Sequence, residues 1–396
     1  MSRELGLQLV LVLLFLTGCA ADTRQKQSES VLLAERAKYF ERLAIQNGAP
    51  QKALVERVAE KQRAFQMGRL ANPPTLEVLI LSGGGDYGAF GAGFLKGWGT
   101  VDRGPWARPT FDAVTGVSTG ALIAPFAFVG DEAAYARVDH LYRNPKPDWI
   151  RERSLLAFLL TGAPFFEVSG LDREIREAAG PDLIRQIAAG AREGRVMAVG
   201  ATNIDYGQQT AFVLSHMAID AEASGDPSRV QDAMLASSAI PIAFPPREIA
   251  GSLYVDGGLT SNILFSGDPE SPTGFSATWR SLYPDLSMPR IRYWVIVNNQ
   301  MVGPPDIVQP RWTSVGGSSV ATAIRASTAA SLRELSLLVR IQRAAGIDSE
   351  MHWVCIPDEW RPPVEGMFKP ETMCDLADLG QRMGSEPASW RTDVNP

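Results

Sequence analysis

The strongest constraint in the sequence is a short turn at residues 116–120, which read Gly-Val-Ser-Thr-Gly. Residues 111–115 before it predict a strand, and residues 119–128 after it predict a helix. A strand that enters a helix through a serine flanked by glycines makes a sharp, strained turn that exposes the serine hydroxyl. With 36 glycines in the chain this pattern is weak by itself, so its meaning depends on the segments around it.

A glycine-rich loop follows an earlier predicted strand. Residues 76–81 are apolar except for Glu77, which is typical of a strand buried on both faces of a parallel sheet, and residues 82–88 read Ser-Gly-Gly-Gly-Asp-Tyr-Gly. The loop also fits the dinucleotide pattern Gly-x-Gly-x-x-Gly, but the second predicted strand does not end in the acidic residue that would bind a ribose. A concavity of backbone N–H groups that binds developing negative charge is the better interpretation.

Two more blocks complete the pattern. Residues 236–241 read Ala-Ser-Ser-Ala-Ile-Pro, and residues 256–258 read Asp-Gly-Gly. Together with the loop and the turn, these blocks resemble the patatin-like phospholipase family over residues 76–299. The resemblance implies a Ser-Asp dyad, with Ser118 as the nucleophile and Asp256 as the base. The glycines that it implies for the oxyanion hole are Gly83, Gly84 and Gly85.

One position departs from the family pattern. The family loop often carries Arg or Lys immediately before its last glycine, whereas this chain has Tyr87, preceded by Asp86. The departure weakens any expectation that the loop attracts anionic phospholipid headgroups. Neutral lipids, zwitterionic lipids and non-lipid acyl esters all stay open as substrates.

A histidine-containing triad is the alternative to the dyad. The chain has three histidines, His140, His216 and His352, and the order Ser118, Asp256, His352 fits the triad of an α/β-hydrolase. Residues 351–355, however, predict a strand, so a packed or hydrogen-bonded structural role is preferred for His352.

The N-terminus predicts export. Residues 1–18 combine a basic start with an apolar run that is too short to span a bilayer. Residues 16–19, Leu-Thr-Gly-Cys, resemble a bacterial lipobox, which implies that Cys19 becomes the lipidated first residue of the mature protein. The alternative is cleavage after Ala21, which would give a soluble exported protein. Because no aspartate follows the cysteine, the resemblance favours a lipid anchor in the outer membrane, facing the periplasm.

Export also bears on the two remaining cysteines. In an oxidising compartment Cys355 and Cys374 can pair, and we predict a disulfide between them. Two separate buried thiols are the alternative, since sequence alone does not show whether the two Cα atoms approach closely enough.

The composition and the periodicity set the architecture. The chain has 396 residues, of which 45% are apolar, and a net charge of −6 without the basic clusters that nucleic-acid binding needs. We predict an α/β fold with three α/β/α layers and a mainly parallel central sheet. A tether and a helical hairpin, with its break at residues 47–50, are expected at residues 19–72. The catalytic domain, with a C-terminal helical extension, is expected at residues 73–396. Further strands are expected at residues 196–199, 253–255 and 293–297, and further helices at residues 150–190 and 318–345.

The sequence therefore predicts a lipid-anchored serine acyl hydrolase of the cell envelope, similar to a phospholipase A or a lysophospholipase. A non-lipid carboxylesterase with a triad and a non-catalytic envelope lipoprotein of the same fold are the alternatives. The apolar residues 155–166 are interpreted as a buried helix or as a lid over the site. No metal or cofactor motif is present, so none is expected.

Overall fold

The computed structural model describes residues 24, 27–152, 166–266 and 274–392. The predicted signal peptide, Cys19 and residues 155–165 of the lid candidate lie outside these ranges and stay predictions. Within the described ranges, no helix has both the length and the apolar character needed to cross a bilayer.

One mixed sheet forms the centre of the molecule, with strand order β10-β9-β1-β2-β5-β8-β7 and β6 paired to β5. Its strands are β1 (Thr75–Leu81), β2 (Ala113–Val117), β5 (Val196–Asn203), β6 (Gln208–Phe212), β7 (Arg247–Ile249), β8 (Ser252–Asp256), β9 (Arg290–Gln300) and β10 (Ser349–Ile356). Neighbouring strands from β10 to β5 are parallel, whereas β6, β7 and β8 run antiparallel to their neighbours. The predicted α/β fold with a mainly parallel sheet is confirmed.

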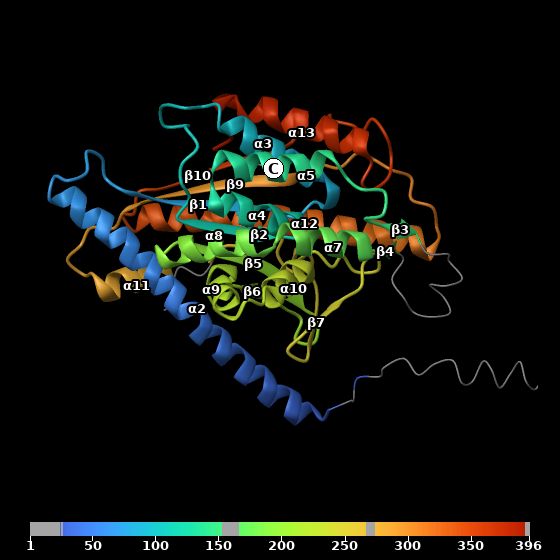
Figure 1. The fold of residues 1–396 in the computed structure, drawn as a ribbon, viewed down its shortest axis with the longest axis horizontal. Coiled ribbons are helices and arrows are strands. Elements are labelled where there is room, and N and C mark those ends of the chain that lie inside the picture. The colour runs from blue at the N-terminus through green and yellow to red at the C-terminus, as the bar shows by residue number, and fades with distance from the viewer. Residues whose placement is uncertain (1–23, 25–26, 153–165, 267–273, 393–396) are drawn as a thin grey trace, which may run out of the picture.

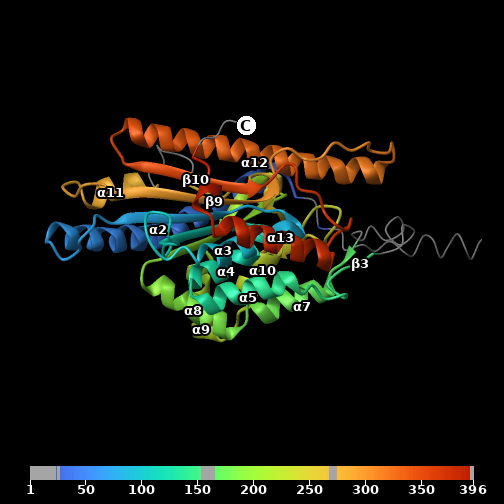
Figure 2. The same ribbon diagram turned by 90° about the horizontal axis from the view of Figure 1, so that it is seen from above.

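Helices cover both faces of this sheet (Figure 1). They are α2 (Glu29–Gln66), α3 (Gly88–Trp98), α4 (Thr119–Val129), α5 (Glu132–Arg143), α7 (Ser169–Ala178), α8 (Pro181–Arg192), α9 (Leu214–Ser224), α10 (Ser228–Ser237), α11 (Phe275–Leu282), α12 (Trp312–Ala344) and α13 (Pro370–Gly384). Figure 2 shows α12 on one side of the sheet and α4, α5, α8 and α9 on the other. A short antiparallel pair, β3 (Arg151–Glu152) and β4 (Phe166–Glu167), lies apart from the main sheet, within the stretch predicted to be helical.

The strand residues alternate between two hydrophobic cores, because successive side chains in a strand point to opposite faces. Trp294 and Ile296 of β9 belong to the core beneath α3, α4, α5 and α13, whereas Tyr293 and Val295 belong to the core beneath α2, α11 and α12. A sheet that is covered on both faces explains why its strands read as continuous apolar runs.

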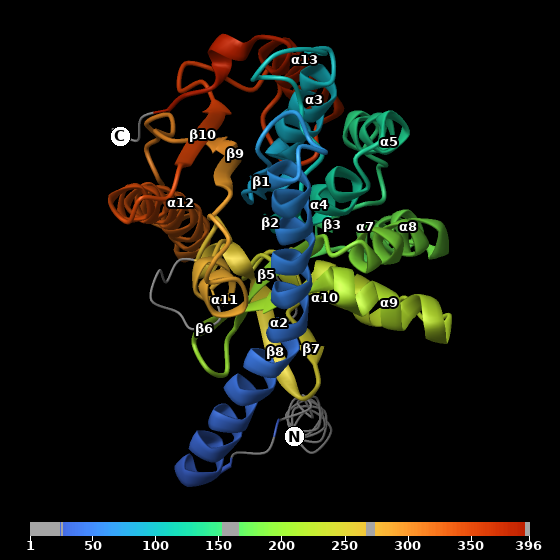
Figure 3. The ribbon, with the colours of Figure 1, turned by 90° about the vertical axis from the view of Figure 1, so that its left-hand side faces the viewer.

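The predicted N-terminal helical hairpin is wrong. The structure has one helix, α2, which continues through Pro50. Pro50 removes one backbone donor, but the helix tolerates this because residues on the C-terminal side of Pro50, among them Leu54, Val55 and Val58, are buried against the sheet. The N-terminal half extends past the body of the protein, as Figure 3 shows.

The predicted disulfide is also wrong, since Cys355 and Cys374 are both free. Cys355 lies on β10 and packs in the core on the α12 side of the sheet. Cys374 lies on α13, in the opposite layer, where its thiol donates to the carbonyl oxygen of Arg143 at 3.4 Å. The sheet therefore separates the two sulfur atoms.

Helix α13 packs on α3 with almost no side chains between the two backbones. A Cβ atom added at Gly93 or Gly97 of α3 would lie within about 2.1 Å of a backbone carbonyl oxygen of α13, and the same holds in reverse for Gly380. Glycine at these positions is therefore required by the close approach and not by backbone conformation.

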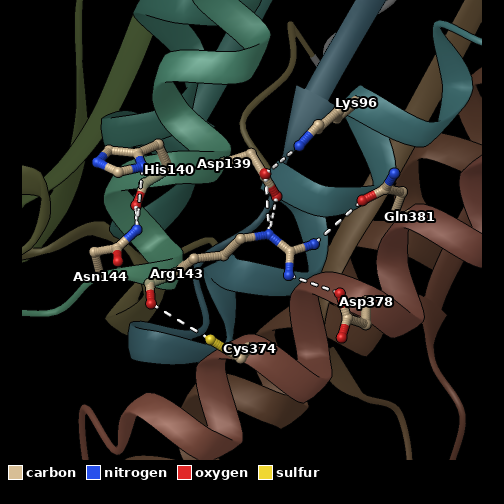
Figure 4. Close-up of polar contacts among 8 residues, drawn as sticks. All are labelled: Lys96, Asp139, His140, Arg143, Asn144, Cys374, Asp378 and Gln381. Carbon is tan, nitrogen blue, oxygen red and sulfur yellow. Dashed lines mark hydrogen bonds and ion pairs between the residues drawn. The ribbon is translucent and has the colours of Figure 1, made fainter.

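An ion network around the buried Asp139 holds the same helices together (Figure 4). Asp139 of α5 accepts hydrogen bonds from Lys96 of α3 at 2.7 Å and from Arg143 at 2.9 Å. Arg143 continues the network to Asp378 of α13 at 2.6 Å and to Gln381 at 3.2 Å. Because Asp139 is 2% exposed and has two cationic partners, the network fixes the position of α13 on α3 and α5.

We expect Gly380→Ala to lower the free energy of unfolding by about 1–3 kcal/mol, because the new methyl group must push α13 away from the Phe90 carbonyl oxygen. Gly48→Ala is the matched control, since a Cβ there meets no atom within 4 Å, and it should stabilise the helix interior by up to about 1 kcal/mol. Thermal unfolding of both variants checks the prediction. An unchanged melting temperature for Gly380→Ala would contradict the close packing.

Candidate active site

Three segments that are distant in sequence meet at one edge of the sheet. In the parallel pair β1 and β2, Leu81 pairs with Gly116, so the glycine loop (residues 82–88) and Ser118 leave the sheet side by side. On the next strands, Gly200 of β5 pairs with Val117, and the adjacent residue Ala201 pairs with Asp256 of β8. The register alone therefore brings Asp256 to the level of Ser118.

Ser118 occupies a strained backbone conformation. Its φ of 53° and ψ of −123° place it outside the common regions for a non-glycine residue. The flanking glycines allow the chain to turn, because a Cβ at Gly116 would lie 2.2 Å from the Gly120 carbonyl oxygen and one at Gly120 would lie 2.2 Å from the Leu81 carbonyl oxygen. The turn places the serine at the N-terminus of α4, as expected from the motif.

The end of α10 holds both Ser118 and Asp256. The buried Ser237 hydroxyl accepts the Ser118 N–H at 2.9 Å and donates to the Gly200 carbonyl oxygen at 2.6 Å. The Ser238 hydroxyl donates to the Ser118 carbonyl oxygen at 3.2 Å. The Ala239 carbonyl oxygen accepts the Asp256 N–H at 2.8 Å. The block at residues 236–241, known from the sequence only as a resemblance, thus fixes the backbone of both predicted catalytic residues.

Asp256 is fully buried, and burial raises the pKa of its carboxyl group from 3.8 to about 6. Hydrogen bonding with the Ser118 side chain and with the Gly258 N–H lowers this pKa in part. Oδ1 accepts the Gly258 N–H at 2.8 Å, whereas Oδ2 has no partner of good hydrogen-bond geometry. The contact with the Ser118 side chain is therefore loose.

The three glycines of the predicted oxyanion hole have different surroundings. The Gly83 N–H already donates to Oδ1 of Asn262 at 3.0 Å, and Asn262 in turn donates to the Thr328 hydroxyl at 2.8 Å. The N–H groups of Gly84 and Gly85 have no acceptor among the described residues. The loop therefore offers two free donors next to Ser118, with Gly83 held in place beside them.

The loop is also tied to the C-terminal part of the chain. Asp86 accepts the Phe368 N–H at 2.8 Å, and burial raises the pKa of Asp86 to about 6 although this bond lowers it in part. Phe368 packs edge-on against Trp149. Because Phe368 lines a cavity beside Ser118, this contact connects the glycine loop to the wall of that cavity.

Ser118 borders two cavities. The first, which we call the apolar pocket, has a volume of about 790 Å³ with the open solvent at its mouth included, and it is lined mainly by apolar side chains of α4, α5, α7 and α10. Glu174 is its only charged lining residue among the described ones, and it is paired with Lys146. The second, the glycine-loop cleft, has a volume of about 1360 Å³, again with open solvent included, and is bordered by the glycine loop, Asp256, Asn262 and one face of α12. Ser118 lines both cavities.

His352 lies away from this site. It packs between Trp106 and Trp294 and faces Glu350 at 3.6 Å. None of the three histidines lines either cavity. In the described part of the chain, no cluster of histidine, cysteine or acidic side chains is arranged to hold a metal ion.

Sequence reasoning missed Asn262, Arg325 and the roles of Ser237 and Ser238. Asn262 comes from the turn after β8, and Arg325 from α12, far along the chain from the motifs. Only the serines carried a signal, because their block was noticed as a resemblance without a physical role.

The comparisons with known proteins give one family match and one structural match. Residues 79–267 match the family model described as Patatin-like phospholipase. Among solved structures, VipD from Legionella pneumophila aligns with 81% of this chain and 68% of its own, at 12% identity and a TM-score of 0.36. No curated protein sequence matches the chain.

We expect Asp256→Asn to stabilise the protein at neutral pH. A folded-state pKa of about 6, above the unfolded value near 4, means that stability is fully present below pH 4 and is lost as the pH rises through 6. Asn stays neutral, so the variant should gain up to about 3 kcal/mol above pH 7 and nothing at pH 4. Thermal unfolding from pH 4 to pH 8 measures this difference. Asp86 is present in both proteins, so its contribution cancels in the difference between their stabilities. A gain in stability that does not depend on pH would contradict the raised pKa of Asp256.

Proposed function

We propose that this chain, whose residues 79–267 form a patatin-like phospholipase domain, is a serine acyl hydrolase that cleaves carboxylic ester bonds of lipids through Ser118 and Asp256. The family supports a lipid acyl hydrolase in general. The observation that supports the dyad is the convergence of a strained serine, a buried carboxylate and two free N–H donors around one opening.

In the proposed mechanism, Asp256 accepts the hydroxyl proton of Ser118 while the serine oxygen attacks the ester carbonyl carbon. The N–H groups of Gly84 and Gly85 stabilise the oxyanion that forms. Asp256 then returns the proton to the leaving alcohol as the carbon–oxygen bond breaks. In the second half, Asp256 removes a proton from water, which attacks the acyl-enzyme, and passes this proton to the Ser118 oxygen as the bond to the acyl group breaks and the fatty acid leaves. The base must be ionised, so the reaction requires a pH above about 6.

The apolar pocket accounts for the acyl chain. From Ser118 it follows α4 past Leu122 to Phe126, which corresponds to roughly 12 Å along the helix axis. A channel of this length with few polar atoms matches an alkyl chain better than it matches a polar substrate.

The dyad is tested with a fluorophosphonate probe and a p-nitrophenyl ester on the full chain. Ser118→Ala should abolish both labelling and turnover, and Asp256→Asn should reduce turnover at least about 1000-fold, because the serine loses its base. His352→Ala is the matched control and should keep turnover within a few-fold, since His352 lies away from the cavities.

Loss of turnover in a folded His352→Ala protein would favour the triad. Failure of the probe to label folded wild-type protein would favour a non-catalytic envelope lipoprotein with the same fold.

The acyl assignment is tested by Leu122→Trp, which fills the apolar pocket one helical turn from Ser118. Hydrolysis of a sixteen-carbon p-nitrophenyl ester should fall about 10-fold or more relative to that of the four-carbon ester, because the long chain loses its space. Fluorophosphonate labelling reports that the site remains intact. An equal loss for both esters would place the acyl chain elsewhere.

A further inference from the structure

Arg325 is the only charged residue between positions 312 and 332 of α12. The rest of this stretch is small, hydroxylated or apolar, yet Arg325 lines the glycine-loop cleft together with the loop, Ser118 and Asp256. It is the only cation among the described residues that border the cleft. A single positive charge therefore faces the proposed reaction centre from a helix outside all the sequence motifs.

The guanidinium group of Arg325 has no protein acceptor in the described part of the chain. It forms no ion pair there, and its buried Nε has no hydrogen-bond partner. It lies against the backbone of Gly303, where an added Cβ would come within 2.5 Å of the guanidinium carbon. Arg195, by contrast, donates through its Nε to the Phe111 carbonyl oxygen at 2.8 Å. An unsatisfied buried donor is costly and calls for a partner from outside the chain.

Arg325 borders the same cleft as Asp86, the residue that precedes Tyr87 in the glycine loop. Burial raises the pKa of the Tyr87 phenol, and the positive charge of Arg325 lowers it in part. The two carboxylates of the cleft do not neutralise Arg325, because Asp86 is directed at the Phe368 N–H and Asp256 at the Gly258 N–H. Among the described residues that border the cleft, the positive charge thus comes from α12 and not from the glycine loop.

The two cavities divide a substrate at Ser118. With the acyl chain in the apolar pocket, the leaving alcohol of the ester must occupy the glycine-loop cleft, which Arg325 lines. Building on the proposed function, we infer that Arg325 is a specificity-determining residue that binds the phosphate group of a glycerophospholipid or lysophospholipid substrate. A guanidinium fits this role because its planar donors match two phosphate oxygens at once.

The test compares two substrates that share one acyl ester, 1-palmitoyl lysophosphatidylcholine and 1-palmitoylglycerol, in mixed detergent micelles. Arg325→Met should raise KM for the phosphate-containing ester about 10- to 100-fold, the loss expected for a charge-assisted hydrogen bond, with kcat nearly unchanged. The neutral ester should change by less than about 3-fold. Arg325→Lys should recover part of the loss because it keeps the charge. Arg333→Met, at an exposed position on the same helix, is the matched control.

Equal losses for both esters in folded Arg325→Met would overturn the assignment, because they would place Arg325 at the reacting ester or in a structural role. No loss for either ester would overturn it as well.

A binding measurement keeps the inference separate from the proposed function. In Ser118→Ala protein, decylphosphocholine, which has no ester to cleave, should bind at least about 10-fold more tightly than decyl glycerol ether, and Arg325→Met should remove this preference. Equal affinities for the two alkyl compounds would refute phosphate recognition. Inorganic phosphate that binds as tightly as decylphosphocholine would refute a lipid ligand. If wild-type protein neither hydrolyses esters nor reacts with the fluorophosphonate, the proposed function fails, while this binding result still decides the role of Arg325.

Discussion

The unfavourable backbone conformation of Ser118 is the constraint on which the rest of the site depends. A non-glycine residue in such a region costs about 1–3 kcal/mol, so the surroundings must hold it there. Gly116 and Gly120 allow the tight turn, and Ser237 and Ser238 bind the N–H and the carbonyl oxygen of the strained residue. The residues at the same helix end also hold Asp256, so they position the proposed nucleophile and its proposed base together.

The mixed sheet explains how residues at one helix end can hold both Ser118 and Asp256. Parallel strands bring the glycine loop and the serine turn to one edge, which is where ligands bind in open α/β sheets. An antiparallel strand ends at the same level and delivers Asp256 directly from its last residue. A carboxylate held in this way loses its contact with water. Because burial disfavours the charged form, the pKa of Asp256 is raised.

Local patterns in the sequence predicted the parts that local interactions determine. The strand, loop and helix around residues 76–99, and the turn at Ser118, are fixed by apolar runs and glycines. The prediction of a helical hairpin was wrong because the burial of α2 against the sheet stabilises the helix more than Pro50 destabilises it. The prediction of a disulfide was wrong because the sequence alone does not show on which side of the sheet each cysteine lies. Asn262 and Arg325 lie outside the sequence motifs, and only the tertiary structure brings them to the glycine-loop cleft.

The close crossing of α3 and α13 has a consequence for how the domain is delimited. The family match ends at residue 267, but α13 and β9 lie beyond it, and β9 is an interior strand paired to β1. A recombinant fragment trimmed to the matched region would expose an interior sheet edge and the glycine-lined surface of α3 to solvent, and would invite aggregation. The unit that folds is therefore larger than the unit that sequence similarity detects, and biochemical work on this protein should keep the C-terminus intact.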